Sequence, residues 1–363
     1  MPLSEQQVLD AVKSVVDPHT GADFVSAKAI RQLSIQGGDV AFGVELGYPA
    51  KSQEAALQAA LTTAVQKLQG VTSVKVAITT KVAAHAVQRG VQLLPGVKNI
   101  VAVASGKGGV GKSTTAVNLA LALAVEGARV GLLDADIYGP SLPMMMGIQG
   151  KPASEDGKTM EPMENHGVQV MSIGFLVDQD QAMVWRGPMA TQALEQLLRQ
   201  TNWKDLDYLV VDMPPGTGDI QLTLSQRVPM TGAVIVTTPQ DIALLDARKG
   251  IKMFEKVGVP ILGIVENMAV HVCSQCGHVE HIFGADGGKK MAADYAMDYL
   301  GALPLNMQIR VQADGGQPTV VAEPDGEIAG LYKAIARQVA VSIAGKNKDF
   351  SAKFPSITIS KNT

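Results

Sequence analysis

A glycine-rich run at residues 106–113, Gly-Lys-Gly-Gly-Val-Gly-Lys-Ser, constrains this chain more than any other feature. It fits the pattern G-x-x-x-x-G-K-[ST], follows the apolar stretch 100–104 and precedes a long helical stretch. Glycines in such a loop let backbone N–H groups converge on phosphate oxygens, and the N-terminus of the following helix adds partial positive charge. The run therefore predicts a phosphate-binding loop between a strand and a helix, in preference to a glycine-rich structural turn.

The loop also predicts which groups would touch a bound nucleotide. Lys112 is placed to hold the β- and γ-phosphates, and the hydroxyl of Ser113 to ligate Mg²⁺. The nucleotide-binding residues expected in this segment are Gly106, Gly108, Gly109, Val110, Gly111, Lys112, Ser113 and Thr114.

The chain after residue 98 alternates short apolar runs with helical stretches, as expected for a doubly wound α/β fold with a mostly parallel sheet. The predicted strands are residues 100–104, 130–134, 168–173, 208–212, 233–237 and 261–267. Open sheets of this type bind ligands at the carboxyl ends of their strands. Residues that follow these runs are therefore the first candidates for a site.

With 363 residues, the chain is long enough for about two domains. We expect a small α+β domain in residues 1–80, a linker in 81–97, an ATPase domain in 98–345 and a polar tail in 346–363. In the first of these, Ser4 is expected to cap one helix and Ser52 to open a second.

Composition excludes several classes of protein. Apolar residues make up 46%, charged residues 18%, and the formal net charge is −3, which argues against a disordered acidic chain or a basic nucleic-acid-coating protein. The longest apolar run, residues 119–125, is far shorter than the roughly 20 residues of a membrane helix. Only two cysteines are present, so a disulfide scaffold is excluded. We expect a cytoplasmic protein without nucleic acid or stable membrane association.

Three carboxylates follow predicted strands. Asp134 and Asp136 are two residues apart at the end of one strand, and Asp212 ends another, before the Pro- and Gly-rich segment 213–219. Asp212 is expected to hold the water shell of Mg²⁺, and the segment after it to move with the γ-phosphate as a second switch. For Asp134 a cap or turn role is the alternative.

The two cysteines, Cys273 and Cys276, form a C-x-x-C pair followed by His278 and His281. Three interpretations remain open. The pair is a redox dithiol, or a zinc site completed by the two histidines, or half of a [4Fe–4S] site in which two chains supply four thiolates. Symmetry would explain why one pair per chain suffices in the third case.

The pattern at residues 106–114 resembles the deviant phosphate-loop ATPases of the MinD/ParA-like superfamily. The segments 265–268, 273–277 and 282–284, with 183–188 and 136–141, resemble the Mrp/ApbC iron–sulfur cluster carrier ATPases over essentially the whole chain. The resemblance implies catalytic roles for Lys107, Lys112 and Asp136, with Lys107 reaching the phosphates of a dimer partner and Asp136 orienting or deprotonating the attacking water. Guanine specificity is typical of an N-K-x-D motif after a strand, and no such motif is present, so adenine is the expected base. The resemblance implies that Asn267 and Pro304 contact it.

The function implied by this resemblance is an ATP-hydrolysing, Mg²⁺-dependent and slow carrier. It would be a homodimer that holds a [4Fe–4S] cluster between its subunits, takes it from scaffold proteins and passes it to apo-proteins. Residues 1–80 lack cysteine, so protein contact is expected of them. The alternatives are a MinD/ParA-like positioning ATPase, or a P-loop ATPase with structural zinc. The predicted helix 328–343 has only two cations, Lys333 and Arg337, and is expected to pack in the core.

Overall fold

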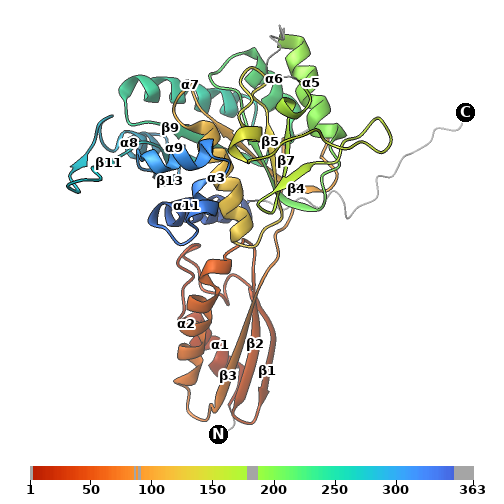
Figure 1. Ribbon diagram of the computed structural model, residues 1–363. Helices are drawn as coiled ribbons and strands as arrows, with labels where there is room; N and C mark the ends of the chain where they lie inside the picture. The colour runs from red at the N-terminus through yellow and green to blue at the C-terminus, as the bar shows by residue number, and fades with distance from the viewer. Residues whose placement is uncertain (1–2, 86, 89–90, 178–186, 347–363) are drawn as a thin grey trace, which may run out of the picture.

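The computed structural model of the chain describes residues 3–85, 87–88, 91–177 and 187–346. Figure 1 shows a narrow N-terminal unit below a larger α/β unit. The predicted polar tail lies outside the described residues from position 347 onward, as do residues 183–186 of one motif that carried the resemblance.

The N-terminal unit packs two helices on one side of a small sheet (Figure 1). Its elements are α1 (Glu5–Lys13), β1 (Ile30–Gln36), β2 (Asp39–Leu46), α2 (Glu54–Gln66) and β3 (Ser73–Thr80). Strand β2 pairs antiparallel with β1 and parallel with β3. Ser4 caps α1 as predicted, in a capping box with Gln7.

Ser52 opens the second helical segment, as predicted, because the turn that contains it leads directly into α2. It lies in a short 3₁₀ turn (Lys51–Gln53), and its backbone N and Oγ donate to the carboxylate of Glu126, at 2.9 and 2.7 Å. Glu126 also pairs with Arg337, and the carboxylate is fully buried. Because a buried carboxylate needs partners, Ser52 also joins the two units, a role that the sequence did not predict.

The large sheet has the strand order β13-β10-β9-β4-β8-β5-β7-β6. Its strands are β4 (Val97–Ala104), β5 (Val130–Asp134), β6 (Met163–Asn165), β7 (Val168–Ser172), β8 (Leu206–Asp212), β9 (Gly232–Thr237), β10 (Ile261–Glu266) and β13 (Tyr299–Ala302). All neighbours pair in parallel except β6 with β7. The predicted α/β class is confirmed; β6 and β13 were not among the predicted strands because they are short.

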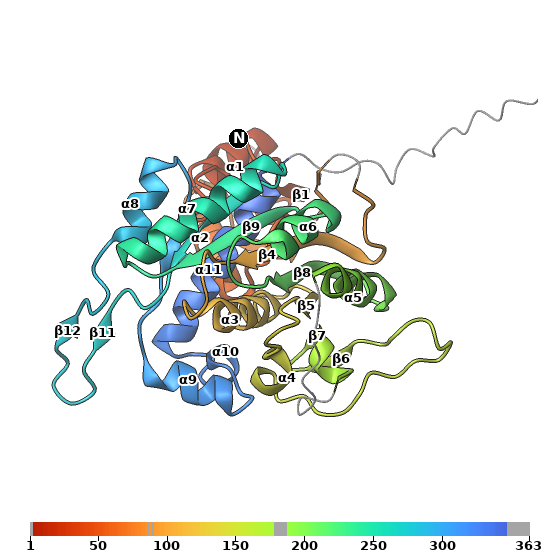
Figure 2. The same ribbon diagram turned by 90° about the horizontal axis from the view of Figure 1, so that it is seen from above.

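Helices cover both faces of this sheet (Figure 2). On one side lie α6 (Asp219–Arg227) and α7 (Asp241–Lys256); on the other lie α3 (Lys112–Val125) and α11 (Glu327–Ala344), packed against each other. The remaining helices are α4 (Leu142–Met145), α5 (Gly187–Gln200), α8 (Gly287–Asp294), α9 (Met307–Asp314) and α10 (Thr319–Ala322).

Helix α3 explains the longest apolar run of the sequence. Its residues from Thr115 to Leu123 are all buried, so the run belongs to a core helix. Helix α11 is also core, as predicted, and the Arg337 side chain is paired inside the protein. Within the described residues, no helix combines the length and hydropathy that a bilayer crossing needs.

Candidate functional site

The phosphate loop connects the end of β4 to the start of α3, at the carboxyl edge of the sheet. Gly109 and Gly111 have φ of 79° and 82°, in the left-handed region that favours glycine. A Cβ on Gly106 would lie 2.1 Å from the backbone carbon of Asp246 in α7. Glycine is therefore required both by the turn and by the close approach of a neighbouring helix.

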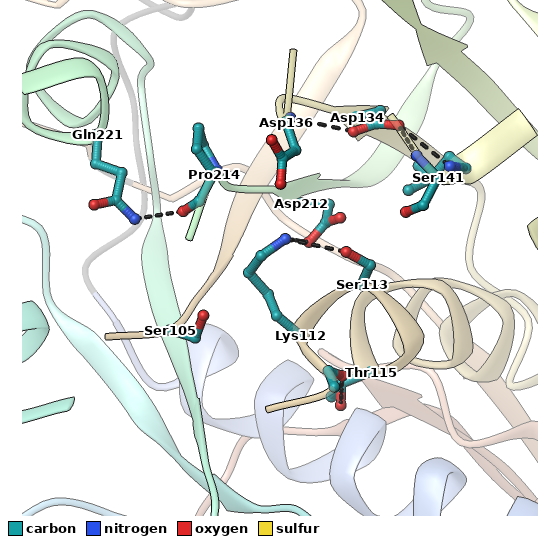
Figure 3. A network of polar contacts seen from close by, with 12 residues as sticks. Ser105, Lys112, Ser113, Thr115, Asp134, Asp136, Ser141, Asp212, Pro214 and Gln221 are labelled. Atoms are coloured by element: carbon teal, nitrogen blue, oxygen red, sulfur yellow. Dashed lines mark hydrogen bonds and ion pairs between the residues drawn. The ribbon is translucent and has the colours of Figure 1, made fainter. Parts of the chain in front are cut away.

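Lys112 opens α3, and its side chain reaches toward Asp212 and Ser113 (Figure 3). Its Nζ lies 2.5 Å from Oδ1 of Asp212 and 3.1 Å from Oγ of Ser113, and both charged groups are buried. Burial raises the pKa of Asp212, and Lys112 opposes that rise. The second oxygen of Asp212, Oδ2, is buried without a hydrogen-bond partner among the described residues.

Asp134 has the cap role that was its alternative. Its carboxylate accepts hydrogen bonds from the backbone N of Asp136, Ser141 and Leu142 and from Oγ of Ser172, at 3.0 to 3.2 Å. Burial, and then the nearby Asp212, raise its pKa well above the ordinary value. Asp134 therefore holds the loop after β5 in shape.

Asp136 lies on that loop and, in Figure 3, its carboxylate is beside Asp212 and across from the Lys112 amine. It is half-buried, and burial raises its pKa while Lys112 acts in the opposite direction. A raised pKa makes a carboxylate a better proton acceptor. The structure thus brings together Lys112, Asp136 and Asp212, from three separate sequence segments.

The segment after Asp212 lies over the same loop. The backbone N of Gly216 donates to Ser105 O at 3.1 Å, and Ser105 Oγ donates to Lys107 O at 2.9 Å. Lys107 itself is half-buried. Contacts within this chain hold the backbone of Lys107 in place.

Asn267 and Pro304 come to the same edge of the sheet, after β10 and β13. Pro304 lies between Leu303 and Leu305, whose N–H groups donate to Glu266 O and Val270 O. The Asn267 amide contacts the phosphate loop itself, donating to Val110 O at 2.9 Å. This contact was not foreseen from the sequence, which assigned Asn267 only a base contact.

The cysteines lie in a hairpin that projects from the large unit in both views (Figures 1 and 2). Its strands are β11 (His271–Val272) and β12 (Val279–Glu280). Cys273 is half-buried, Cys276 is exposed, and both are free thiols. Hydrogen bonds from the backbone of Gln275 and Cys276 lower the pKa of the Cys273 thiol.

The histidines near this pair have other partners. His281 Nδ1 donates to Ala269 O at 2.9 Å, and His271 Nδ1 donates to Leu305 O at 3.1 Å. The His278 side chain is 68% exposed and faces Glu280. In the described ranges, no group of three or more His, Cys, Asp or Glu side chains is arranged to hold a metal ion. A zinc site completed by the two histidines is therefore not assembled in one chain.

A parallel sheet whose central strand leads through a glycine loop into a buried helix defines a P-loop nucleoside triphosphatase. Residues 96–340 match a family described as NUBPL iron-transfer P-loop NTPase, and residues 5–76 match one described as iron-sulfur cluster assembly protein. The chain therefore belongs to the NUBPL iron-transfer P-loop NTPase family, and the resemblance to iron–sulfur cluster carriers is confirmed.

Individual relatives agree with this family. The chain is 62% identical over 278 residues to an iron-sulfur cluster carrier protein of Pseudomonas fragi, covering 76% of this chain and 97% of that protein. It is 37% identical, with a TM-score of 0.56, to a nucleotide-binding protein from Archaeoglobus fulgidus in complex with ADP, covering 64% and 90% of the two chains. The Pyrococcus furiosus cell division ATPase MinD, 21% identical at a TM-score of 0.50 over 66% and 98%, shares the fold.

Proposed function

We propose that this protein is a cytoplasmic ATPase that carries a [4Fe–4S] cluster between two copies of itself and delivers it to apo-proteins. The observation that carries the proposal is the hairpin, which presents two free thiols, and no described residue of the same chain is arranged to complete a metal site with them. Two chains with two thiols each supply the four thiolates of such a cluster. The family names of its relatives support the same function.

The nucleotide half of the proposal rests on the buried cluster of charges. Lys112 exchanges its bond to Asp212 for phosphate oxygens, and the loop amides surround the phosphates. Asp136 accepts a proton from the attacking water, whose oxygen bonds to the γ-phosphorus as the bond to the β-phosphate oxygen breaks. Lys107 of each copy neutralises charge on the phosphates of the other. Asn267 and Pro304 contact the adenine.

Mg²⁺ fits the residues present. Asp212 Oδ2 is a buried carboxylate oxygen without a hydrogen-bond partner in the described part of the chain, and the amine of Lys112 contacts both Asp212 and the Ser113 hydroxyl. Hard oxygen donors of this kind suit Mg²⁺, which neutralises charge between the β- and γ-phosphates. Ser113 and, through water, Asp212 would hold the ion.

The surface around the cysteines suits a second copy. Val272, Val279 and Ile282 are exposed on the hairpin, and Ile242 and Leu245 on α7. Exposed apolar side chains beside a half-complete metal site, as on this hairpin, are typical of an interface. In transfer, each iron exchanges a thiolate of this protein for a thiolate of the client, so the cluster keeps its oxidation state.

Anaerobic reconstitution with iron and sulfide tests the proposal. We expect about four iron and four sulfide per dimer by chemical assay, a dimeric mass by light scattering, and slow Mg²⁺-dependent ATP hydrolysis. Cys273→Ser should lose the iron and keep ATP binding, and an apo-protein client should gain the cluster from the wild type. Zinc without iron in both preparations would overturn the cluster assignment.

A further inference from the structure

The strand end that carries Asn267 connects the phosphate loop directly to the cysteine hairpin. Asn267 is 7% exposed, and its amide nitrogen donates to Val110 O inside the loop. A Cβ on Gly111 would lie only 2.1 Å from that nitrogen, so the amide is packed against the loop backbone. Movement of the loop at Val110 therefore has to displace Asn267 or break this bond.

The backbone from Asn267 to Cys273 is held by hydrogen bonds along its length. Asn267 N donates to Thr237 O at 2.7 Å, Ala269 N to Leu303 O at 3.0 Å, and Leu305 N to Val270 O at 2.8 Å. Cys273 is only six residues from Asn267. Because little of this path is free to absorb a displacement, a shift of Asn267 reaches the hairpin.

The hairpin also returns to the same strand end. His281 Nδ1 donates to Ala269 O, and Gly288 N, at the start of α8, donates to the carboxylate of Glu266. A Cβ on Gly288 would lie 2.8 Å from that carboxylate. Both ends of the cysteine segment are thus attached to Glu266–Ala269, the residues that carry the amide in contact with the phosphate loop.

We propose that Asn267 is a positioning residue that couples phosphate binding at residues 106–113 to the geometry of Cys273 and Cys276. The coupling rests on the proposed function, in which one chain binds both nucleotide and cluster. The coupling adds a mechanism to that function: it gives a path by which the nucleotide state changes how the cluster is held. The path through Asn267 is separate from the second switch, whose Met213 and Gly216 bond to Val103 and Ser105.

Thiol reactivity tests the coupling without any cluster. The cluster-free full-length protein is alkylated anaerobically with iodoacetamide, with and without a non-hydrolysable ATP analogue and Mg²⁺, and the rates at Cys273 and Cys276 are followed by mass spectrometry. We expect the analogue to change the rates about fivefold in the wild type. In Asn267→Asp, which has no amide to donate to Val110 O, the rates should no longer depend on nucleotide.

A matched control is available at the same sheet edge. Asn306 caps α9 by accepting a hydrogen bond from Gln308 N, so Asn306→Asp keeps that cap and makes the same chemical change away from the loop. It should respond to nucleotide as the wild type does. Full nucleotide dependence in Asn267→Asp, or nucleotide-insensitive thiols in a wild type that binds the analogue, would overturn the coupling.

Direct measurement of analogue binding separates this inference from the proposed function. A wild type that binds no nucleotide contradicts the ATPase assignment itself. If Asn267→Asp alone fails to bind, His281→Ala decides, because it removes the hairpin's bond to Ala269 O and leaves the loop contact intact. The nucleotide effect on the thiols should then fall at least about twofold with binding unchanged; an undiminished effect would contradict the path.

Discussion

The phosphate loop and the cysteine hairpin lie at the same sheet edge but are built in opposite ways. The loop residue Lys112 is buried and paired with the buried Asp212 at the end of β8 of the same chain. The hairpin has one half-buried and one exposed thiol and several exposed apolar side chains, and the described residues of its own chain bring the thiols no further ligand. The buried charges of the phosphate site are therefore neutralised within one chain, whereas the proposed cluster site depends on the thiols of a second copy.

The largest effect is expected from Lys112→Ala. The change removes the cation proposed to hold the phosphates and leaves Asp212 buried without it, so ATP hydrolysis should fall about a thousandfold or more. Steady-state phosphate release measures this. Iron and sulfide loading of the hairpin by chemical reconstitution should persist, because the thiols do not depend on Lys112. Loss of both properties in a folded variant would contradict the separation of the two sites.

Glu126→Ala should have the next largest effect. It leaves Arg337 buried without its carboxylate and removes the acceptor of Ser52, at the end of α3 opposite the phosphate loop. We expect about 3 kcal/mol of lost stability in urea unfolding. Glu126→Gln is the control, because it keeps an acceptor for Ser52 and should lose less. Equal stability of Glu126→Ala and the wild type would show that this junction is not closed in solution.

Cys273→Ser should have the opposite effect to Lys112→Ala, because it should remove iron binding and leave the phosphate site intact. Because the hairpin is exposed, the substitution should change the free energy of unfolding by less than about 0.5 kcal/mol. Iron content after reconstitution should nevertheless fall at least about tenfold, since two of the four proposed thiolates per dimer are lost. Ser274→Ala, in the same turn, should bind iron as the wild type does. Iron retention by Cys273→Ser would indicate that the ligands lie elsewhere.

The sequence predicts the phosphate loop better than its surroundings for a physical reason. The loop is a local pattern in which backbone geometry requires glycines at fixed spacing. Residues 106–113 can therefore be recognised from the local sequence alone. The bonds from Asn267 to Val110 and from Ser52 to Glu126 join residues 157 and 74 positions apart. Such contacts depend on tertiary packing, and the sequence offers only an amide or a hydroxyl with several local uses.

The short strands β6 and β13 escaped prediction for a related reason. Three or four residues are too few to show a period, and their pairing is decided by the strand beside them. The roles of Lys107 and Pro304 remain predictions from resemblance, because a partner's phosphates and a base are needed to define them. The sequence predicts a functional residue well where its partners are close in sequence. It predicts one less well where the partners come from a distant segment or from a second chain.

The smallest expected effect concerns the thiol of Cys273. Backbone hydrogen bonds from Gln275 and Cys276 lower its pKa, so the thiolate should persist to lower pH than in an ordinary cysteine. In Cys276→Ser, which leaves one thiol, the pH midpoint of iodoacetamide alkylation should lie below about 8.5 and rise on urea unfolding.

Gly277→Ala supplies the matched control for this midpoint. Gly277 has a φ of 71° and closes the turn through a bond from its N–H to Cys273 O, so a side chain there strains the geometry that directs the amides at the sulfur. Added to Cys276→Ser, it should move the midpoint toward the unfolded value. A midpoint that is the same in the folded and unfolded protein would mean that the hairpin is not organised before iron arrives. A lowered midpoint would show that the hairpin of a single chain already stabilises the Cys273 thiolate, so that the proposed cluster site needs from a second copy only its two thiols.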